Sequence, residues 1–118
     1  MLKILAMPKN TNVNGKIFGG WIMSKMDLGG AILAKKISNG KVATVYVNNL
    51  IFIKPINVGD IVSCYAKCIN IGKTSMKINI ELWIKKIILK KNIFLAAKAK
   101  FVYVAIKKNG KKRNIIKI

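Results

Sequence analysis

Helical spacing organises the most apolar stretch of the chain, residues 19–36. Its apolar positions recur at steps of three and four residues, as in a helix, and form two series: Ile22, Met26, Gly29 and Leu33, and Trp21, Leu28 and Ile32. Because the stretch is apolar nearly all round, we expect this helix to be buried at the centre of the fold. Lys35 and Lys36 suit its C-terminal end, and Asn39-Gly40 ends it.

Strand patterns lie on both sides of this helix. Residues 2–7 predict a short first strand that Pro8 stops. Four longer patterns follow the helix, at residues 42–53, 61–71, 74–89 and 93–106. The pattern at 74–89 alternates most regularly, with an apolar face made of Met76, Ile78, Ile80, Leu82 and Ile84. We expect these four strands to form a meander, with turns at Val58-Gly59-Asp60 and Gly72-Lys73.

One long helix with an antiparallel sheet is an α+β arrangement, and a sheet curled around the helix would explain its all-round apolar surface. The 118 residues fit one domain. We expect this domain to span residues 1–113, with a basic C-terminal tail, residues 107–118, that is frayed. No run approaches the length of a membrane span. The apolar stretch before Pro8 is too short for a secretory signal, so the default expectation is a cytoplasmic protein.

The charge balance is strongly basic, with 23 Lys plus Arg against three acids and a formal net charge of +20. Such a chain attracts polyanions, so nucleic acid, anionic membranes and phosphate-bearing molecules are all candidate partners. A second interpretation is an AT-rich coding sequence, because Ile, Lys and Asn make up nearly half of the chain. On that interpretation lysine fills neutral surface positions, and we expect no specific nucleic acid partner.

Histidine is absent, which excludes nucleophilic mechanisms that use a His base. Cys64 and Cys68 cannot complete a four-ligand zinc site without histidine. On one face of a strand they also lie too far apart for a disulfide. We interpret them as small buried apolar residues in a reducing compartment.

Asp27 is the most informative residue, because it is an acid inside the most apolar helix. Burial raises the pKa of a carboxyl group, and perturbed acids serve as catalytic bases. The alternative is an ordinary helical aspartate on a solvated face or paired with a lysine. Gly19-Gly20 at the helix start leaves free N–H groups that could hold a developing oxyanion, and Asn12 or Asn14 could add a donor. Together these residues describe a plausible acyl-transfer site.

The segment from Asn12 to Lys36 resembles the signature of the YciA-type acyl-CoA thioesterases, which belong to the hotdog-fold acyl-CoA hydrolases. The resemblance rests on the string Asn-x-x-Gly-x-x-Phe-Gly-Gly-Trp-Ile-Met-x-x-Met-Asp that ends at Asp27. It continues through Thr44-Val45, Val58-Gly59-Asp60 and other short motifs up to Phe101-Val102-Tyr103-Val104-Ala105. It covers roughly residues 7 to 113, almost the whole chain.

The resemblance implies a hotdog fold and hydrolysis of acyl-CoA without a metal or a cofactor, coenzyme A being part of the substrate. Asp27 would act as general base toward water or as nucleophile, and Asn12 would orient the water or the thioester. Backbone N–H groups at Phe18, Gly19 and Gly20 would polarise the thioester carbonyl. The family forms dimers that assemble into tetramers or hexamers, with each site between two subunits.

Coenzyme A carries several phosphate charges, and Lys54, Lys73, Thr74 and Ser75 are candidates to contact them or the pantetheine arm. For each lysine the alternative is a solvated surface residue. Trp21 borders the acyl channel on one interpretation and belongs to the core on the other.

Two other functions fit the same residues. A hotdog protein could bind acyl-CoA or acyl carrier protein without hydrolysis, and only the intact Asn12 and Asp27 argue against this. A basic polyanion-binding module would show steeply salt-dependent DNA binding, but the chain lacks an exposed aromatic platform for single strands. Trp83, on the polar face of its strand, is a candidate for a subunit interface.

Overall fold

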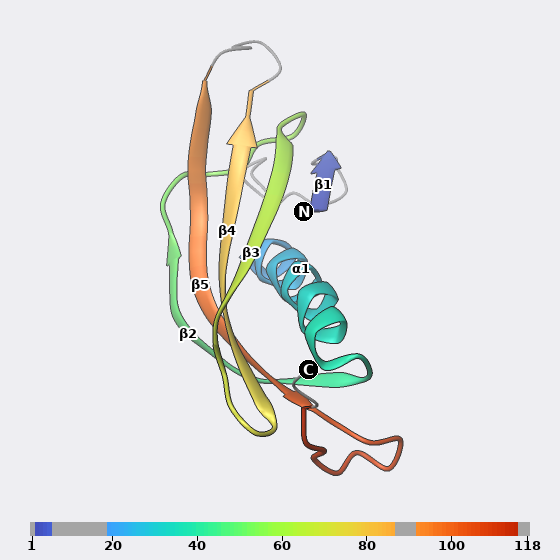
Figure 1. Ribbon diagram of the computed structural model, residues 1–118. Coiled ribbons are helices and arrows are strands. Elements are labelled where there is room, and N and C mark those ends of the chain that lie inside the picture. The colour runs from blue at the N-terminus through green and yellow to red at the C-terminus, as the bar shows by residue number, and fades with distance from the viewer. Residues whose placement is uncertain (1, 6–18, 87–91, 116–118) are drawn as a thin grey trace.

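The computed structural model describes residues 2–5, 19–86 and 92–115 (Figure 1). The elements in this part are α1 (Gly19–Ser38) and strands β1 (Leu2–Leu5), β2 (Val42–Phe52), β3 (Ile61–Ile71), β4 (Ser75–Lys85) and β5 (Ile93–Ala105). The strands form one antiparallel sheet in the order β1-β3-β4-β5-β2. Figure 1 shows the long strands curving, with α1 against their concave side. This is the helix-wrapped α+β sheet that the resemblance implied, so the expected hotdog fold is confirmed.

The core lies between α1 and the centre of the sheet. The predicted alternation of β4 is confirmed, because its five inward side chains have no exposed surface: Met76, Ile78, Ile80, Leu82 and Ile84. The buried face of α1 packs on this layer through Ile22, Met26 and Ala34. Burying apolar side chains on both partners is the main force that holds the helix to the sheet.

The expected four-strand meander is wrong for β2. Strands β3, β4 and β5 are consecutive neighbours, but β2 pairs with β5, in a register that begins with Val42 opposite Ala105. The connection over residues 53–60 therefore carries the chain from one side of the sheet to the other, across β5 and β4 in Figure 1. Ile56 is fully buried at its middle and anchors it to the core. The turn residues predict a change of direction, but not which strand comes next.

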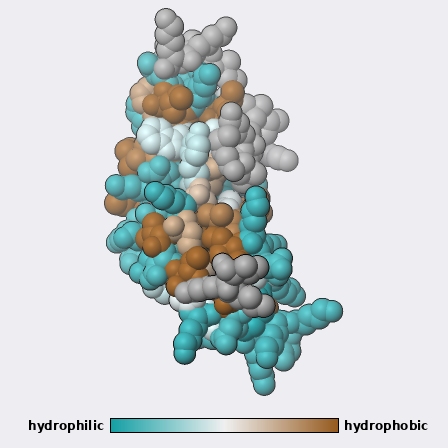
Figure 2. All heavy atoms as spheres, in the orientation of Figure 1, coloured by the Kyte–Doolittle hydropathy of each residue, from teal (hydrophilic) through white to brown (hydrophobic). Residues whose placement is uncertain are grey.

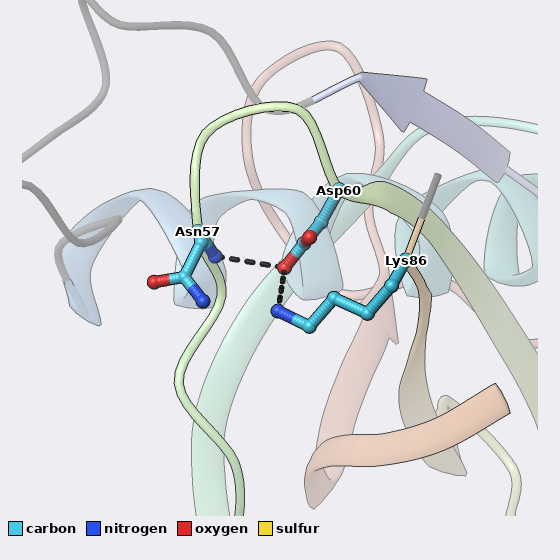
Figure 3. A network of polar contacts seen from close by, with 3 residues as sticks. All are labelled: Asn57, Asp60 and Lys86. Atoms are coloured by element: carbon cyan, nitrogen blue, oxygen red, sulfur yellow. Dashed lines mark hydrogen bonds and ion pairs between the residues drawn. The ribbon is translucent and has the colours of Figure 1, made fainter. Parts of the chain in front are cut away.

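The buried residue Asp60 lies at the end of this connection, where it makes two polar contacts (Figure 3). Asp60 is 4% exposed, and its carboxylate Oδ2 accepts hydrogen bonds from the backbone N–H of Asn57 at 2.8 Å and from Lys86 Nζ at 2.7 Å. Gly59 takes the positive φ of 92° that the turn requires. A buried carboxylate is tolerated where its charge is paired and hydrogen-bonded. Asp60 therefore ties the connection to the end of β4.

The expected burial of α1 on all sides is wrong for the single chain. The sheet covers one face, whereas Leu28 and Ile32 on the other face are 46% and 53% exposed. Figure 2 shows hydrophobic residues gathered on the lower half of this side of the molecule, where α1 lies in Figure 1. No helix in the described ranges is long and apolar enough to cross a membrane.

The expected frayed tail differs from the structure over residues 107–115. The chain turns at Lys107 to Gly110 and comes back, so that the backbone N–H of Arg113 donates to Ala105 O at 2.9 Å. The N–H of Ile115 donates to Lys73 O at 2.7 Å, and the Ile115 side chain is buried. The last three residues of the predicted tail, 116–118, lie outside the described part.

Arg113 explains why this segment is ordered. It is the one arginine of the chain, and its guanidinium donates to Ile106 O at 3.0 Å, to Ser38 O at 2.9 Å and to Lys41 O at 3.2 Å. The carbonyl groups at the end of α1 have no partner within the helix and require donors from elsewhere. A guanidinium offers five donors in a fixed plane, which a lysine ammonium cannot match.

Candidate active site

Asp27 lies on the side of α1 that faces β2 and β5, and two hydroxyl groups hold its carboxylate. Its Oδ1 accepts a hydrogen bond from Thr44 Oγ1 at 2.6 Å, and the Tyr103 hydroxyl lies 3.1 Å from the same oxygen. The Tyr103 hydroxyl is also 2.9 Å from the main-chain oxygen of Asp27. Thr44 and Tyr103 are opposite each other in the β2–β5 register. A helix and two strands therefore meet at one carboxylate.

An open depression of about 270 Å³ lies beside this carboxylate. Helix α1 and strands β2 and β5 line it with Gly20, Met23, Ser24, Asp27, Thr44, Val47 and Phe101. Asp27 is half-buried and Thr44 is exposed, whereas Phe101 is buried. A mainly apolar depression with a few convergent polar groups is typical of a small-molecule site.

Tyr103 is fully buried. Burial, and then the nearby Asp27 carboxylate, raise the pKa of Tyr103 well above its ordinary value. The phenol therefore keeps its proton through the neutral range and acts as a donor.

Cys64 is not an activated nucleophile. Cys64 is buried beneath α1, and burial raises the pKa of its thiol to about 11. Cys68 is half-buried, and both thiols are free. Within the described ranges no three residues of the His, Cys, Asp and Glu types come close enough to hold a metal ion.

The structure brings part of the predicted site together. Gly20 lies in the depression with Asp27, and Gly19 begins α1 close to the ring of Phe52. Both glycines are exposed, and N–H groups of a first helical turn have no partner inside the helix. Two predicted residues, Asn12 and Phe18, lie outside the described residues.

Trp21 lies on the buried face of α1, is 7% exposed and belongs to the core cluster. It is not among the side chains that line the depression. This matches the core interpretation, while its predicted contact with an acyl chain stays a prediction.

The candidate residues for coenzyme A lie toward opposite ends of the sheet. Lys54 follows β2, and its Nζ lies 3.5 Å from the centre of the Phe94 ring. Lys73 and Thr74 lie in the turn between β3 and β4, and Ser75 is the first residue of β4. Phe52, two residues before Lys54, pairs with Ala97 of β5, whereas Ser75 pairs with Val104 of the same strand. These two positions of β5 are seven residues apart, which is roughly 23 Å at the usual rise of a strand. One chain therefore does not bring Lys54 next to Lys73.

Thr44 and Tyr103 are the site residues that the sequence did not identify. Both stand in motifs that carry the family resemblance, but nothing in their spacing connects them to Asp27. They are 17 and 76 residues away from it along the chain. Only the pairing of β2 with β5 brings the three together, and that pairing was not predicted.

Comparisons with known proteins agree with this geometry. A family model described as the thioesterase superfamily matches residues 14–90. An uncharacterized acyl-CoA thioester hydrolase of Buchnera aphidicola is 62% identical, over 98% of this chain and 87% of its own length. The acyl-CoA thioester hydrolase YciA of Escherichia coli is 52% identical, over 96% of this chain and 87% of its own length. The solved hexameric thioesterase of Yersinia pestis is 52% identical with a TM-score of 0.93, over 98% and 93% of the two chains.

A more distant structure bears on the site itself. An acyl-CoA hydrolase of Staphylococcus aureus is 28% identical with a TM-score of 0.87, over 97% of this chain and 70% of its own. Two mutants of that hydrolase have been solved, one with an aspartate replaced by alanine and one with a threonine replaced by alanine. The two mutated positions are 17 residues apart in its sequence. Asp27 and Thr44 have the same separation. With the matches above, the sequence resemblance is confirmed: the chain belongs to the thioesterase superfamily and, within it, to the YciA-type acyl-CoA thioester hydrolases.

Proposed function

We propose that this protein hydrolyses acyl-CoA thioesters to free carboxylic acids and coenzyme A at the depression beside Asp27. The observation that carries the proposal is the Asp27 carboxylate, held by Thr44 and Tyr103 at the edge of an open, mainly apolar depression. An acyl chain suits the apolar lining, and the carboxylate supplies the base or nucleophile that hydrolysis needs. Family membership gives the substrate class.

In the proposed reaction the thioester carbonyl carbon lies next to the carboxylate of Asp27. As a general base, Asp27 takes a proton from water while the water oxygen attacks that carbon, and the C–S bond then breaks. The coenzyme A thiolate leaves and takes up the proton. As a nucleophile, Asp27 itself displaces the thiolate and forms an anhydride that water opens. The overall balance is the same: acyl-CoA and water give acid and thiol.

The negative charge that develops on the carbonyl oxygen requires donors. We propose the free N–H groups at Gly19 and Gly20 for this role, together with that of Phe18. The start of α1 favours this assignment, because unpaired N–H groups and the positive end of the helix dipole both stabilise an anion there. The absence of side chains at the glycines lets a substrate oxygen approach the backbone closely. Asn12 is proposed to orient the water or the thioester.

We propose that the chain self-associates into dimers and further into tetramers or hexamers, with the site completed between two copies. Two exposed apolar surfaces support this: Leu28 and Ile32 on α1, and Tyr46 and Phe52 on the edge strand β2. The depression lies between α1 and β2, so a second copy on these surfaces would cover it. The solved Yersinia pestis relative is hexameric.

The phosphate groups of coenzyme A are proposed to contact Lys54 or the hairpin residues Lys73, Thr74 and Ser75. Their separation within one chain favours contributions from two subunits. For the whole protein we propose a cytoplasmic location, since free Cys64 and Cys68 suit a reducing compartment.

The test is release of free thiol from acyl-CoAs of increasing chain length, corrected for the thiols of the protein. Asp27→Asn should lower kcat by at least about 100-fold, because it removes the base while keeping the shape of the side chain. Glu81→Gln is the matched control, because it makes the same change of charge on an acid of the outer sheet face whose carboxylate accepts a hydrogen bond from Trp83. The proposal is supported if the wild type releases thiol, Asp27→Asn does not, and Glu81→Gln does. A folded wild type that binds coenzyme A and releases no thiol at any chain length would instead indicate the non-hydrolytic binder.

A further inference from the structure

The two hydroxyl groups at Asp27 contact the same carboxylate oxygen. Thr44 Oγ1 is 2.6 Å and the Tyr103 hydroxyl 3.1 Å from Oδ1. In the described part of the chain, Oδ2 has no hydrogen-bond partner. The two oxygens of one carboxylate are therefore unequal, because Oδ1 is fixed to the sheet while Asp27 as a residue lines the depression.

Tyr103 reaches Asp27 through a recess at Gly30 of α1, and the neighbouring Gly29 makes a second close approach to the sheet. A Cβ atom on Gly30 would overlap the Tyr103 hydroxyl and lie 2.5 Å from Ile80 Cδ1. A Cβ atom on Gly29 would lie 2.5 Å from Cys64 Sγ. Distances under about 3 Å are not reached by real Cβ atoms, so a side chain at either position would force the helix or the facing side chains to shift. The hydroxyl of Tyr103 enters the space one turn after Asp27.

Packing alone does not account for a tyrosine at this position. Its neighbour Phe101 lies on the same face of β5, with the two rings stacked at 6.1 Å between centroids. A phenylalanine at 103 would fill nearly the same volume. A fully buried hydroxyl costs stability unless it is hydrogen-bonded, and both oxygens within its reach belong to Asp27.

We propose that Tyr103 is a positioning residue: by sharing its one hydroxyl proton between Oδ1 and the main-chain oxygen of Asp27, it fixes the carboxylate so that Oδ2 is the atom that attacks or takes the proton. This inference rests on the proposed function and adds the choice of the reacting oxygen. An aspartate side chain on a helix has several rotamers. Holding one of them through Oδ1 keeps the other oxygen aligned with the substrate and lowers the entropic part of the barrier.

The kinetic test compares Tyr103→Phe with Tyr65→Phe. Tyr65 is an exposed residue of β3, so its variant makes the same chemical change away from α1. Tyr103→Phe should lower kcat by about 10- to 100-fold with little change in KM, because the substrate still binds but meets a carboxylate in several orientations. Tyr65→Phe should match wild type. Unchanged kcat in a folded Tyr103→Phe protein, or a change confined to KM, would overturn the proposal.

A second readout does not depend on activity. Asp27 and Asp60 are the two aspartates of the chain, so labelling aspartate with ¹³C gives an infrared carboxylate band from two groups, and Asp27→Asn identifies which part belongs to Asp27. Tyr103→Phe should shift the Asp27 band and leave the Asp60 band in place. If Tyr103→Phe leaves the Asp27 band in place, the proposed hydrogen bond from Tyr103 to the Asp27 carboxylate is refuted, even if the enzyme is active. A wild type without thioesterase activity would refute the proposed function, and with it the role of Tyr103 in catalysis, while the band shift would still report the contact.

Discussion

At the scale of single residues, the three acids of this basic chain have three different partners. Asp27 accepts from Thr44 and Tyr103 at the depression. Asp60 pairs with Lys86 in the connection to β3, and Glu81 accepts from the indole N–H of Trp83 at 3.2 Å on the outer face of the sheet. Glu81 lines separate depressions on that outer face, whereas Asp27 is the acid that lies beside two hydroxyl donors and the start of α1, which makes it the candidate catalytic acid.

Thr44 gives a second test of the carboxylate geometry. Thr44→Val keeps the shape of the side chain but removes the donor at 2.6 Å from Oδ1, so kcat should fall by about 10-fold or more with little change in KM. Thr44→Ser retains a hydroxyl and should recover most of the rate. Both constants come from the thiol-release assay. Equal rates for Thr44→Val and wild type would show that Tyr103 alone is sufficient to hold Asp27.

Sequence reasoning found Asp27 and Gly20 but assigned no role to Thr44 or Tyr103. An acid inside an apolar helix and a glycine pair at its start are local signals. The contacts of Thr44 and Tyr103 depend on the β2–β5 register, which contains an irregularity directly after Thr44. A shift by one residue would turn Thr44 to the other face, and no local pattern fixes that register.

At the scale of elements, Arg113 is predicted to stabilise the end of α1. Arg113→Lys should lower the free energy of unfolding by about 1–3 kcal/mol, because the guanidinium reaches the three carbonyls from three separate nitrogens, whereas an ammonium group has a single nitrogen that cannot lie within reach of all three. Lys108→Arg, at an exposed position of the same segment, is the matched control and should be neutral. Chemical denaturation of both variants measures the difference. Equal stability would mean that water replaces the lost donors without cost.

The elements themselves were predicted better than their arrangement. The third strand was expected at residues 61–71 and β3 spans Ile61–Ile71, because alternation and flanking turns are visible within a short window. The position of β2 in the sheet was not predicted. It lies at the edge because it pairs with β5, which is about fifty residues away along the chain, and no local pattern reveals such a pairing. The order of the C-terminal segment was missed because five basic residues within 107–113 suggested a solvated tail, whereas the contacts of Arg113 and Ile115 hold it.

At the scale of the whole molecule, the high positive charge of each copy opposes the association of copies. Each copy carries a net charge of +20, and bringing copies together raises their mutual repulsion. The exposed apolar face of α1 favours association. We therefore expect the particle mass of the assembly to be higher at physiological ionic strength than at low ionic strength, because salt screens the repulsion between copies.

Ile32→Glu tests the surface that drives this assembly. Ile32 is 53% exposed on α1, and a glutamate there would bury an unpaired charge in the proposed contact, so the particle mass should fall. Ile69→Glu, on an exposed position of β3, is the control. Light scattering during size-exclusion chromatography reports both masses. A mass unchanged by Ile32→Glu would remove this face of α1 from the proposed contact.

The close approach at Gly29 and Gly30 has a consequence for redesign. Consecutive positions on a helix point in directions about 100° apart, and here one contacts Cys64 of β3 while the other contacts Ile80 of β4 and Tyr103 of β5. A larger side chain at either glycine would press against a different part of the sheet, so we expect it to displace α1 and Asp27 with it. Variants made to change the acyl preference should therefore keep these two positions and alter Met23 and Ser24, which are exposed side chains in the lining of the depression.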